Sequence, residues 1–173
     1  MSKLDVLFVN PGHAGAIYQD LATDFAAIEP PTWALLLAES VRSVGFSPAI
    51  LDVNAERLST EEMVERILSL EPRLICFVIY GQNPNSGTVN MSGAVLLADS
   101  FKEAGISIPL CAVGSHVSAL PTQVLKNEIA FDFVFCNEGV YALRNVLALD
   151  SIDSPGLNNV RGIAHRLGSE IVL

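Results

Sequence analysis

Leu74-Ile75-Cys76-Phe77-Val78-Ile79 is the stretch that decides the fold. It is apolar at every position and dominated by branched and aromatic side chains, which is typical of a strand whose sheet is covered on both faces. Pro72 stops the segment before it, and a polar loop begins after it at Tyr80. We therefore interpret 74–79 as a buried strand of a parallel sheet.

Four further apolar runs of similar length lie on either side of this stretch. They are Leu4–Val9, Pro48–Val53, Ile108–Val113 and Phe131–Cys136. The segments between the runs have helical periodicity and are long enough for crossover helices. This alternation predicts an α/β fold with a doubly wound, five-stranded parallel sheet and helices on both faces.

Five helices are expected between and after the strands. They are placed at Thr32–Val44, from Ser59 to the residue before Pro72, at Ser86–Ala104, just after Pro121, and at Gly139–Leu149. Ser59 and Glu62 have the spacing of a capping box, which favours a helix start at this point. In the first helix, we expect a buried stripe formed by Trp33, Leu36, Leu37 and Val41.

The last part of the chain has a different composition. Asp150–Asn159 is rich in Asp, Ser, Pro, Gly and Asn, which is typical of a linker or surface loop. Beyond it, two short runs flank Leu167-Gly168-Ser169 and predict a β-hairpin, in which His165 is expected to be exposed. We therefore expect an α/β domain at 1–150, and a linker with a hairpin at 151–173 that leads to a downstream domain absent from this chain.

The charge of the chain argues against polyanionic partners. The formal net charge is -9, and the ten Lys and Arg residues form no cluster. Nucleic acids and membranes are therefore not expected as partners. The first apolar run is too short for the core of a signal peptide. The chain also has no uninterrupted stretch of about 18 apolar residues, which is the length needed to span a bilayer. These features predict a cytoplasmic protein.

The cysteines do not have the spacing of a metal site. Cys76, Cys111 and Cys136 each lie in an apolar run, with neither a CxxC pair nor a disulfide framework, so we expect buried, reduced thiols. His13 and His116 have no Cys, Asp or His partner at ligand spacing. We assign no metal ligand.

The candidate binding residues follow the strands, because an open parallel sheet binds ligands beyond the carboxyl ends of its strands. They are Asn10, Pro11, Gly12, His13, Tyr80, Gly81, Gln82, Asn83, Gly114, Ser115, His116, Asn137, Glu138 and Gly139. Glycine permits close approach, and the polar side chains suit a neutral, amide-rich or weakly anionic ligand. An alternative is that Gly and Asn only make the turns. Glu138 has no acid or base partner nearby in sequence, so we assign no catalytic residue.

Two nucleotide-binding patterns and one signalling pattern are missing. The segment Asn10–Gly15 does not match GxGxxG, and no GxxxxGK[ST] occurs. A phosphorylated receiver domain would need an acidic pair after the first strand and an Asp after the third, but Asn10 and Tyr80 stand at these places.

Four stretches, in their order and spacing, carry a resemblance to a known family. They are Val6–Pro11, Glu29–Ala38, Val113–Pro121 and Phe131–Gly139. Together they resemble the amino-terminal cobalamin-binding domain of class B radical S-adenosylmethionine enzymes, which include methyltransferases and enzymes similar to Mg-protoporphyrin monomethyl ester cyclase. The family's two glycines before Pro-His correspond here to Gly114 and Ser115.

The resemblance implies a flavodoxin-like, or Rossmann-like, sheet that holds cobalamin over its strand ends through the four loops. It implies a radical S-adenosylmethionine domain, in cis or in trans, as the partner that carries the iron-sulfur cluster and S-adenosylmethionine. The chain departs from the cobalamin signature DxHxxG, since Asn10 and His13 stand in its place with one extra residue between them. No axial cobalt ligand is therefore assigned.

The three cysteines cannot form the CxxxCxxC cluster motif of those enzymes. The chain is thus expected to be the non-catalytic part of such an enzyme, which positions the corrinoid for methyl transfer or ring formation. Two alternatives remain open. One is a degenerate flavodoxin-like domain with an assembly or regulatory role and no cofactor. The other is a hydrolase or transferase, which no visible nucleophile and base pair supports.

Overall fold

The computed structural model describes residues 4–11, 30–81 and 84–173, and the backbone alone at 84–89 and 154. Its strands are β1 Val6–Asn10, β2 Pro48–Asp52, β3 Leu74–Ile79, β4 Leu110–Gly114, β5 Phe133–Phe135, β6 Ile163–Leu167 and β7 Glu170–Val172. Its helices are α3 Thr32–Arg42, α4 Val53–Glu56, α5 Thr60–Leu70, α6 Pro84–Glu103, α7 Ser115–Ala119, α8 Pro121–Asn127, α9 Val140–Leu147 and α10 Ser154–Leu157. The strand β3 has the bounds that the sequence predicts.

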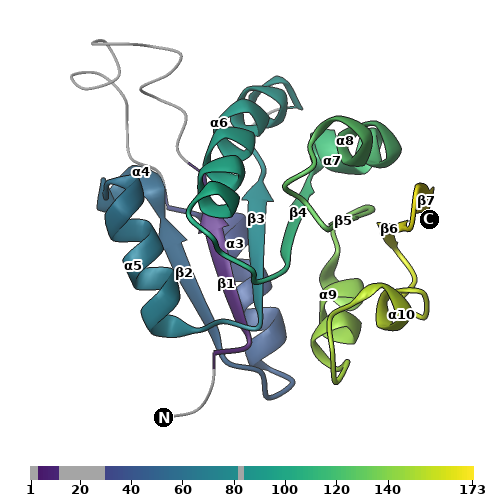
Figure 1. Ribbon diagram of the computed structural model, residues 1–173. Coiled ribbons are helices and arrows are strands. Elements are labelled where there is room, and N and C mark those ends of the chain that lie inside the picture. Colours follow the sequence, from purple (N-terminus) through teal and green to yellow (C-terminus); the bar gives the residue numbers. More distant parts are fainter. Residues whose placement is uncertain (1–3, 12–29, 82–83) are drawn as a thin grey trace.

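The strands of the described residues form one sheet in the order β2-β1-β3-β4-β5-β6-β7 (Figure 1). The first five strands are parallel, as the sequence predicts. The hairpin does not stand apart from them: β6 pairs antiparallel with β5, and β7 pairs antiparallel with β6. The expected count of five strands is therefore too low, because the hairpin satisfies the backbone groups that β5 would otherwise expose at an edge.

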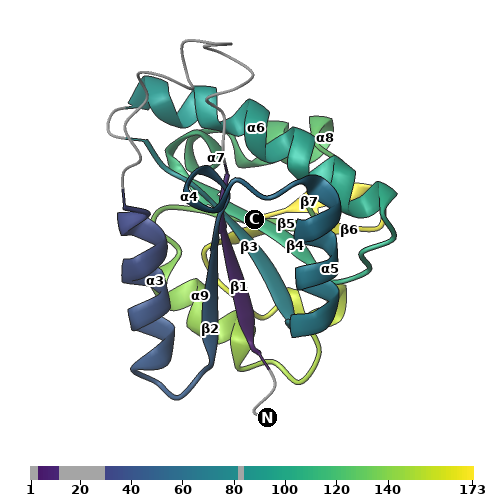
Figure 2. The same cartoon turned by 90° about the vertical axis from the view of Figure 1, so that its left-hand side faces the viewer.

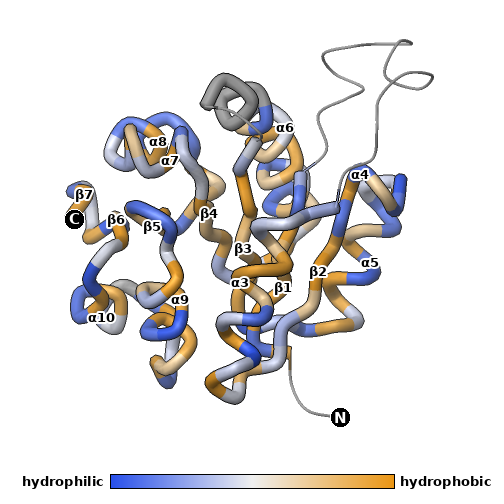
Figure 3. The backbone as a smooth tube through the Cα atoms, turned by 180° about the vertical axis from the view of Figure 1, so that it is seen from behind, coloured by the Kyte–Doolittle hydropathy of each residue, from blue (hydrophilic) through white to orange (hydrophobic). Residues whose placement is uncertain are grey.

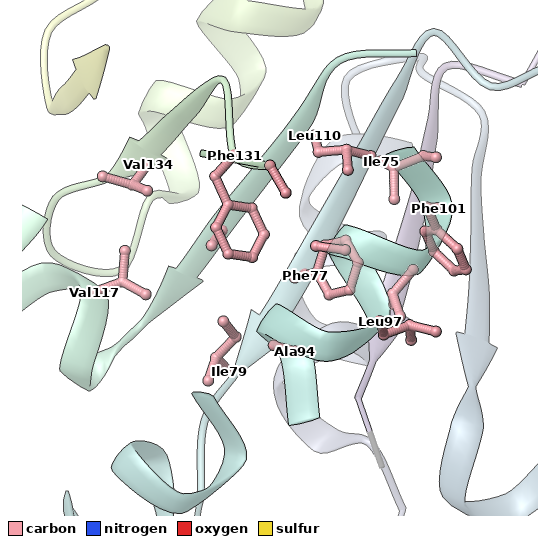
Figure 4. Packing of buried hydrophobic residues seen from close by; sticks show 14 of the residues in the cluster. Ile75, Phe77, Ile79, Ala94, Leu97, Phe101, Leu110, Val117, Phe131 and Val134 are labelled. Carbon is pink, nitrogen blue, oxygen red and sulfur yellow. The ribbon is translucent and has the colours of Figure 1, made fainter. Parts of the chain in front are cut away.

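Helices cover both faces of the sheet (Figure 2). On one face, α5, α6, α7 and α8 enclose a core in which Phe77 contacts Phe101 and Phe131 (Figure 4). On the other face, α3, α9 and α10 pack against the opposite side chains of the same strands. The apolar colouring of the strand backbones agrees with burial from both sides (Figure 3). Among the described helices, none is both long and apolar enough to cross a membrane.

The helix α3 buries a different stripe from the one expected. Its buried residues are Ala34, Leu37, Ala38 and Val41, whereas Trp33 is 39% exposed and Leu36 is 58% exposed. The prediction was therefore right for two of its four residues. The small side chains of Ala34 and Ala38 let the helix lie close to the sheet. With these alanines facing the sheet, Trp33 and Leu36 point toward solvent.

The predicted start signal of α5 and the predicted turn of the hairpin are both present. The helix α5 begins with the capping box: the Glu62 backbone N–H donates to Ser59 Oγ, and the Ser59 N–H donates to the Glu62 carboxylate. In the hairpin, Gly168 has a φ of 62°, the left-handed conformation expected for its turn. Local capping chemistry was therefore predictable from sequence spacing alone.

Two details of the expected loops were wrong. Ser115–Ala119 forms the short helix α7 instead of a loop, although only Val117 of this helix is buried. His165 is 3% exposed, since it lies on β6 directly opposite Phe133 of β5. Both errors arise from long-range packing, which the local pattern does not contain.

Candidate functional site

The position of the site follows from the strand order. The chain passes from β1 through α3 to β2 on one side of β1, and β3 lies on its other side. The order thus reverses between β1 and β3, which is the point where doubly wound sheets leave a ligand crevice at their carboxyl ends. In Figure 1, the arrowheads of β1, β2 and β3 mark this edge of the sheet.

At the ends of β1 and β2, Asn10 is held by an acidic residue that sequence reasoning missed. Asn10 Nδ2 donates to Asp52 Oδ1 at 3.0 Å, and Asp52 is only 8% exposed. The same carboxylate oxygen accepts the backbone N–H of Ala55 and caps α4. Asn54 Nδ2 approaches the carbonyl oxygen of Pro11 at 3.5 Å. An acidic residue at the end of a predicted strand was the signal that could have identified Asp52.

At the end of β3, Tyr80 forms an aromatic pair with Trp33 at the start of α3. The ring centroids are 4.4 Å apart, and the ring planes differ by 21°, so the rings are stacked. Burial raises the pKa of the Tyr80 phenol to about 12, and the charges of Glu138 and Cys76 add to this effect. The phenol is therefore neutral near pH 7. Trp33, which the sequence places in the buried stripe of α3, instead lies next to Tyr80 at this edge of the sheet.

The other side of the β3 end is held by α6. Asn90 Nδ2 donates to the backbone carbonyl oxygen of Tyr80 at 2.9 Å. Asn90 Oδ1 is buried and has no hydrogen-bond partner among the described residues. A buried acceptor without a partner is unusual, and at a crevice it suits a donor from a ligand or water. The sequence did not predict Asn90 as a site residue, because it lies inside a predicted helix and not in a loop after a strand.

At the end of β4, Gly114 is required by the packing of the protein itself. A Cβ at this position would lie 2.1 Å from the carbonyl oxygen of Ile79 on β3. The absence of a side chain therefore lets α7 start close to the end of β3. Ser115 and His116 follow in α7, where both are partly exposed.

At the end of β5, the loop is tied to α7 and approaches Tyr80. The Asn137 backbone N–H donates to Ser118 Oγ at 2.7 Å. Gly139 has a φ of 68°, and a Cβ there would lie 3.0 Å from the Phe135 side chain. Glu138 is exposed, and its charge acts on the Tyr80 phenol across the end of β4. The ends of β3, β4 and β5 thus form one continuous surface.

Ten of the candidate residues are described, and all of them lie along the carboxyl edge of the sheet. They are Asn10, Pro11, Tyr80, Gly81, Gly114, Ser115, His116, Asn137, Glu138 and Gly139. Gly12, His13, Gln82 and Asn83 lie outside the described residues. Within the described ranges, no group of three or more His, Cys, Asp or Glu could hold a metal ion.

Two of the three thiols lie away from this edge, whereas Cys136 is only half-buried and directly precedes the β5 loop, so the expectation of a buried thiol is wrong for Cys136. Cys76 and Cys111 are buried and stand opposite each other in the register of β3 and β4. Burial raises the pKa of the Cys111 thiol well above its usual range, and the neighbouring Cys76 adds to the effect. A thiol with a raised pKa is a poor nucleophile and a poor metal ligand near pH 7. The edge therefore offers neutral hydrogen-bonding groups, an aromatic pair and two carboxylates.

Comparison with known proteins identifies the class of this α/β domain. The family model described as B12 binding domain matches residues 18–147, which is more than half of the chain. The chain belongs to the B12-binding domain family, whose cofactor is cobalamin. The resemblance that the sequence carries is thereby confirmed. No curated protein matches the chain.

Several solved structures share the fold, and three of them are structures of radical S-adenosylmethionine enzymes. Two are of the radical S-adenosylmethionine methyltransferase TsrM from Kitasatospora setae. The structure with cobalamin and an iron-sulfur cluster has a TM-score of 0.71, 15% identity and 99% coverage of this chain. The structure with tryptophan and a S-adenosylmethionine analogue has a TM-score of 0.69, 15% identity and 98% coverage.

The third solved structure is of OxsB, described as a cobalamin-dependent S-adenosylmethionine radical enzyme, without bound cofactor. It has a TM-score of 0.62, 14% identity and 99% coverage of this chain. This chain spans 30% of each TsrM chain and 22% of the OxsB chain. At these identities the structural likeness establishes the fold.

Proposed function

We propose that this chain binds cobalamin over the carboxyl ends of β1, β3, β4 and β5 and positions it for a radical S-adenosylmethionine domain. The observation that carries the proposal is that the described residues of all four predicted loops lie at one edge of the sheet, where the strand order reverses. Membership in the B12-binding domain family supports cobalamin as the occupant.

The residues of this edge fit a large, amide-rich and mainly neutral group. Gly114 lets β4 end directly against Ile79 of β3, so the two strand ends lie close together on the surface that would face the ligand. The buried Asn90 oxygen lacks a partner among the described residues, and the amide groups around a corrin ring are suitable donors. The neutral Tyr80 phenol and the Trp33 indole add aromatic surface.

When bound, cobalamin supplies a cobalt centre that carries a methyl group or transfers electrons. The residues of this chain bind and orient it. Those proposed to contact it are Asn10, Pro11, Tyr80, Gly81, Gly114, Ser115, His116, Asn137, Glu138 and Gly139. Asn10 is already oriented by its hydrogen bond to Asp52, and Asn137 by its bond to Ser118. A scaffold that holds its polar groups in place binds with a smaller entropy cost.

The partner in this proposal is a radical S-adenosylmethionine domain, in cis or in trans, that carries out methyl transfer or ring formation in the cytoplasm. The structural likeness to TsrM and OxsB, together with the small share of those chains that is covered, supports a further catalytic domain. We propose that 151–173, whose strands β6 and β7 extend the sheet beyond the α/β unit expected at 1–150, leads toward that domain. A CxxxCxxC motif in the neighbouring coding sequence is the expected observation.

The proposal is tested by adding hydroxocobalamin to the purified chain, removing free ligand on a desalting column and recording the visible spectrum. We expect a coloured protein with about one cobalamin per chain. Tyr80→Ala should weaken binding about tenfold, because it removes the aromatic surface at the end of β3. Ile129→Ala is the control, since Ile129 is 79% exposed and precedes β5 at the opposite edge of the sheet.

A colourless wild-type protein contradicts the proposal and favours the degenerate domain without a cofactor. Equal binding by wild type and Tyr80→Ala, with weakened binding by Ile129→Ala, places the ligand at another surface and contradicts the proposed site.

A further inference from the structure

Trp33 occupies an unusual position for the first turn of a packed helix. The residues beside it on α3 that face the sheet, Ala34 and Leu37, are 1% and 3% exposed, whereas Trp33 is 39% exposed. Its ring stacks on Tyr80, which follows β3, and α3 itself follows β1. Trp33 therefore lies near the strand-order reversal between β1 and β3, where doubly wound sheets bind their ligands.

The Trp33–Tyr80 pair is held from both directions. The start of α3 is fixed by the Thr32 N–H, which donates to the Pro30 carbonyl oxygen at 2.8 Å. Below this turn, Leu37, Ala38 and Val41 anchor the helix in the core. Tyr80 is held at its backbone by Asn90 Nδ2. The backbone on both sides of the pair is thus held in place, which reduces the conformational entropy that is lost when a ligand binds.

A fold gains free energy by burying an indole, so an indole left partly exposed at a binding edge is a candidate contact. The surface around it suits a planar, neutral group: the Tyr80 phenol stays protonated, and the pair carries no formal charge. A corrinoid offers the planar faces of its macrocycle and of its benzimidazole base. These faces match the aromatic surface, whereas a polyanion would meet the charge of Glu138 near Tyr80.

We propose that Trp33, backed by Tyr80, contacts the bound corrinoid directly and determines a large part of its affinity. This inference rests on the proposed function and adds a residue that neither the loop pattern nor the family resemblance assigns. An aromatic contact of this kind corresponds to an affinity change of about tenfold.

The test measures hydroxocobalamin binding by equilibrium dialysis for wild type, Trp33→Ala, Trp33→Phe and Leu36→Ala. We expect Trp33→Ala to bind about tenfold more weakly, and Trp33→Phe to recover most of the affinity because it restores an aromatic face. Leu36→Ala should bind as wild type, since Leu36 lies one turn further along α3 and is 58% exposed. Circular dichroism and thermal unfolding report whether each variant is folded.

The outcomes separate the two proposals. Failure of the wild type to bind overturns the proposed function. Binding by the wild type, together with unchanged affinity in a folded Trp33→Ala variant, overturns the contact and leaves the proposed function standing. If Trp33→Ala does not fold, Trp33→Phe and Leu36→Ala decide. A loss of about tenfold in Leu36→Ala contradicts a specific aromatic contact and indicates a wider protein-docking surface on α3.

Discussion

The Tyr80 phenol lies at the end of β3, close enough to Glu138 for the carboxylate charge to act on it. Burial is the largest cause that raises its pKa from 10.0 to about 12, followed by the charges of Glu138 and Cys76. In the unfolded chain, the phenol releases its proton near pH 10, but the folded protein retains it until about pH 12. Stability from this group is therefore complete below pH 10 and is lost as the pH rises to about 12.

This shift predicts the titration of one tyrosine among the three in the chain. The ultraviolet absorbance of tyrosinate, recorded as a difference between wild type and Tyr80→Phe, should show a group with a pKa near 12. Glu138→Gln should lower that pKa, because it removes a nearby negative charge. A difference curve centred at pH 10, the ordinary value for tyrosine, contradicts the described burial of Tyr80.

Among the single residues of the candidate site, the polar and glycine residues after the strands were predictable from the sequence, whereas Trp33 was not. Gly114 and Gly139 were predictable because they follow strands, yet the reason for them differs from the expected one. Their missing side chains accommodate Ile79 and Phe135 of the protein itself. Trp33 was misplaced, since an apolar side chain in a helix is expected to be buried unless a ligand or a partner covers it.

At the scale of elements, the junction between β4 and α7 is the tightest point of the site. Gly114→Ala would place a Cβ 2.1 Å from a backbone oxygen of β3, so the strands would have to move apart. We expect the free energy of unfolding to fall by about 3 kcal/mol, which corresponds to a fall in Tm of about 6–12 °C.

Gly105→Ala provides the control for this substitution. Gly105 follows α6 with a φ of 84°, but an added Cβ would meet nothing within 4 Å. The Gly105→Ala substitution should lower the free energy of unfolding by about 1 kcal/mol, because alanine is strained in the left-handed conformation. Thermal unfolding of both variants gives the comparison. Equal falls in Tm would show that the β3 and β4 ends are not packed as described.

Elements with a strong local pattern were predictable, and elements that depend on distant partners were not. Leu74–Ile79 is apolar throughout, so its burial on both faces was unambiguous. On α3, two overlapping sets of apolar residues have helical spacing. The prediction chose the set with Trp33 and Leu36 because these side chains are larger, but the helix buries the set with Ala34 and Ala38. The helix α7 buries one residue, which is too few for a period to be visible.

The addition of β6 and β7 to the sheet depends on β5, which lies about 30 residues earlier in the chain. The hairpin itself was recognisable from Gly168 and its flanking runs, but its docking position was not. Its register with β5 also explains why His165 is buried.

At the scale of the whole molecule, the two edges of the sheet differ. The amino edge is closed by side chains: Arg73 Nη1 donates to Asp5 Oδ1 at 3.4 Å and to the Leu147 carbonyl oxygen at 3.1 Å. The Asp132 carboxylate accepts the backbone N–H of Leu110 at 2.8 Å. The carboxyl edge instead presents the Trp33–Tyr80 pair and the Asn90 oxygen, which has no partner among the described residues. This asymmetry supports the carboxyl edge as the place of the ligand.

The central claim, cobalamin at the carboxyl edge, is tested most directly by amide hydrogen exchange of the chain with and without hydroxocobalamin. We predict slower exchange at 80–81, 114–118 and 137–139, because a bound corrinoid excludes water from these segments and stabilises their hydrogen bonds. Exchange near Asp5, Arg73 and Leu110 at the amino edge should change little. Protection confined to the amino edge or to the β6–β7 hairpin, in a protein that retains the ligand, would contradict the account.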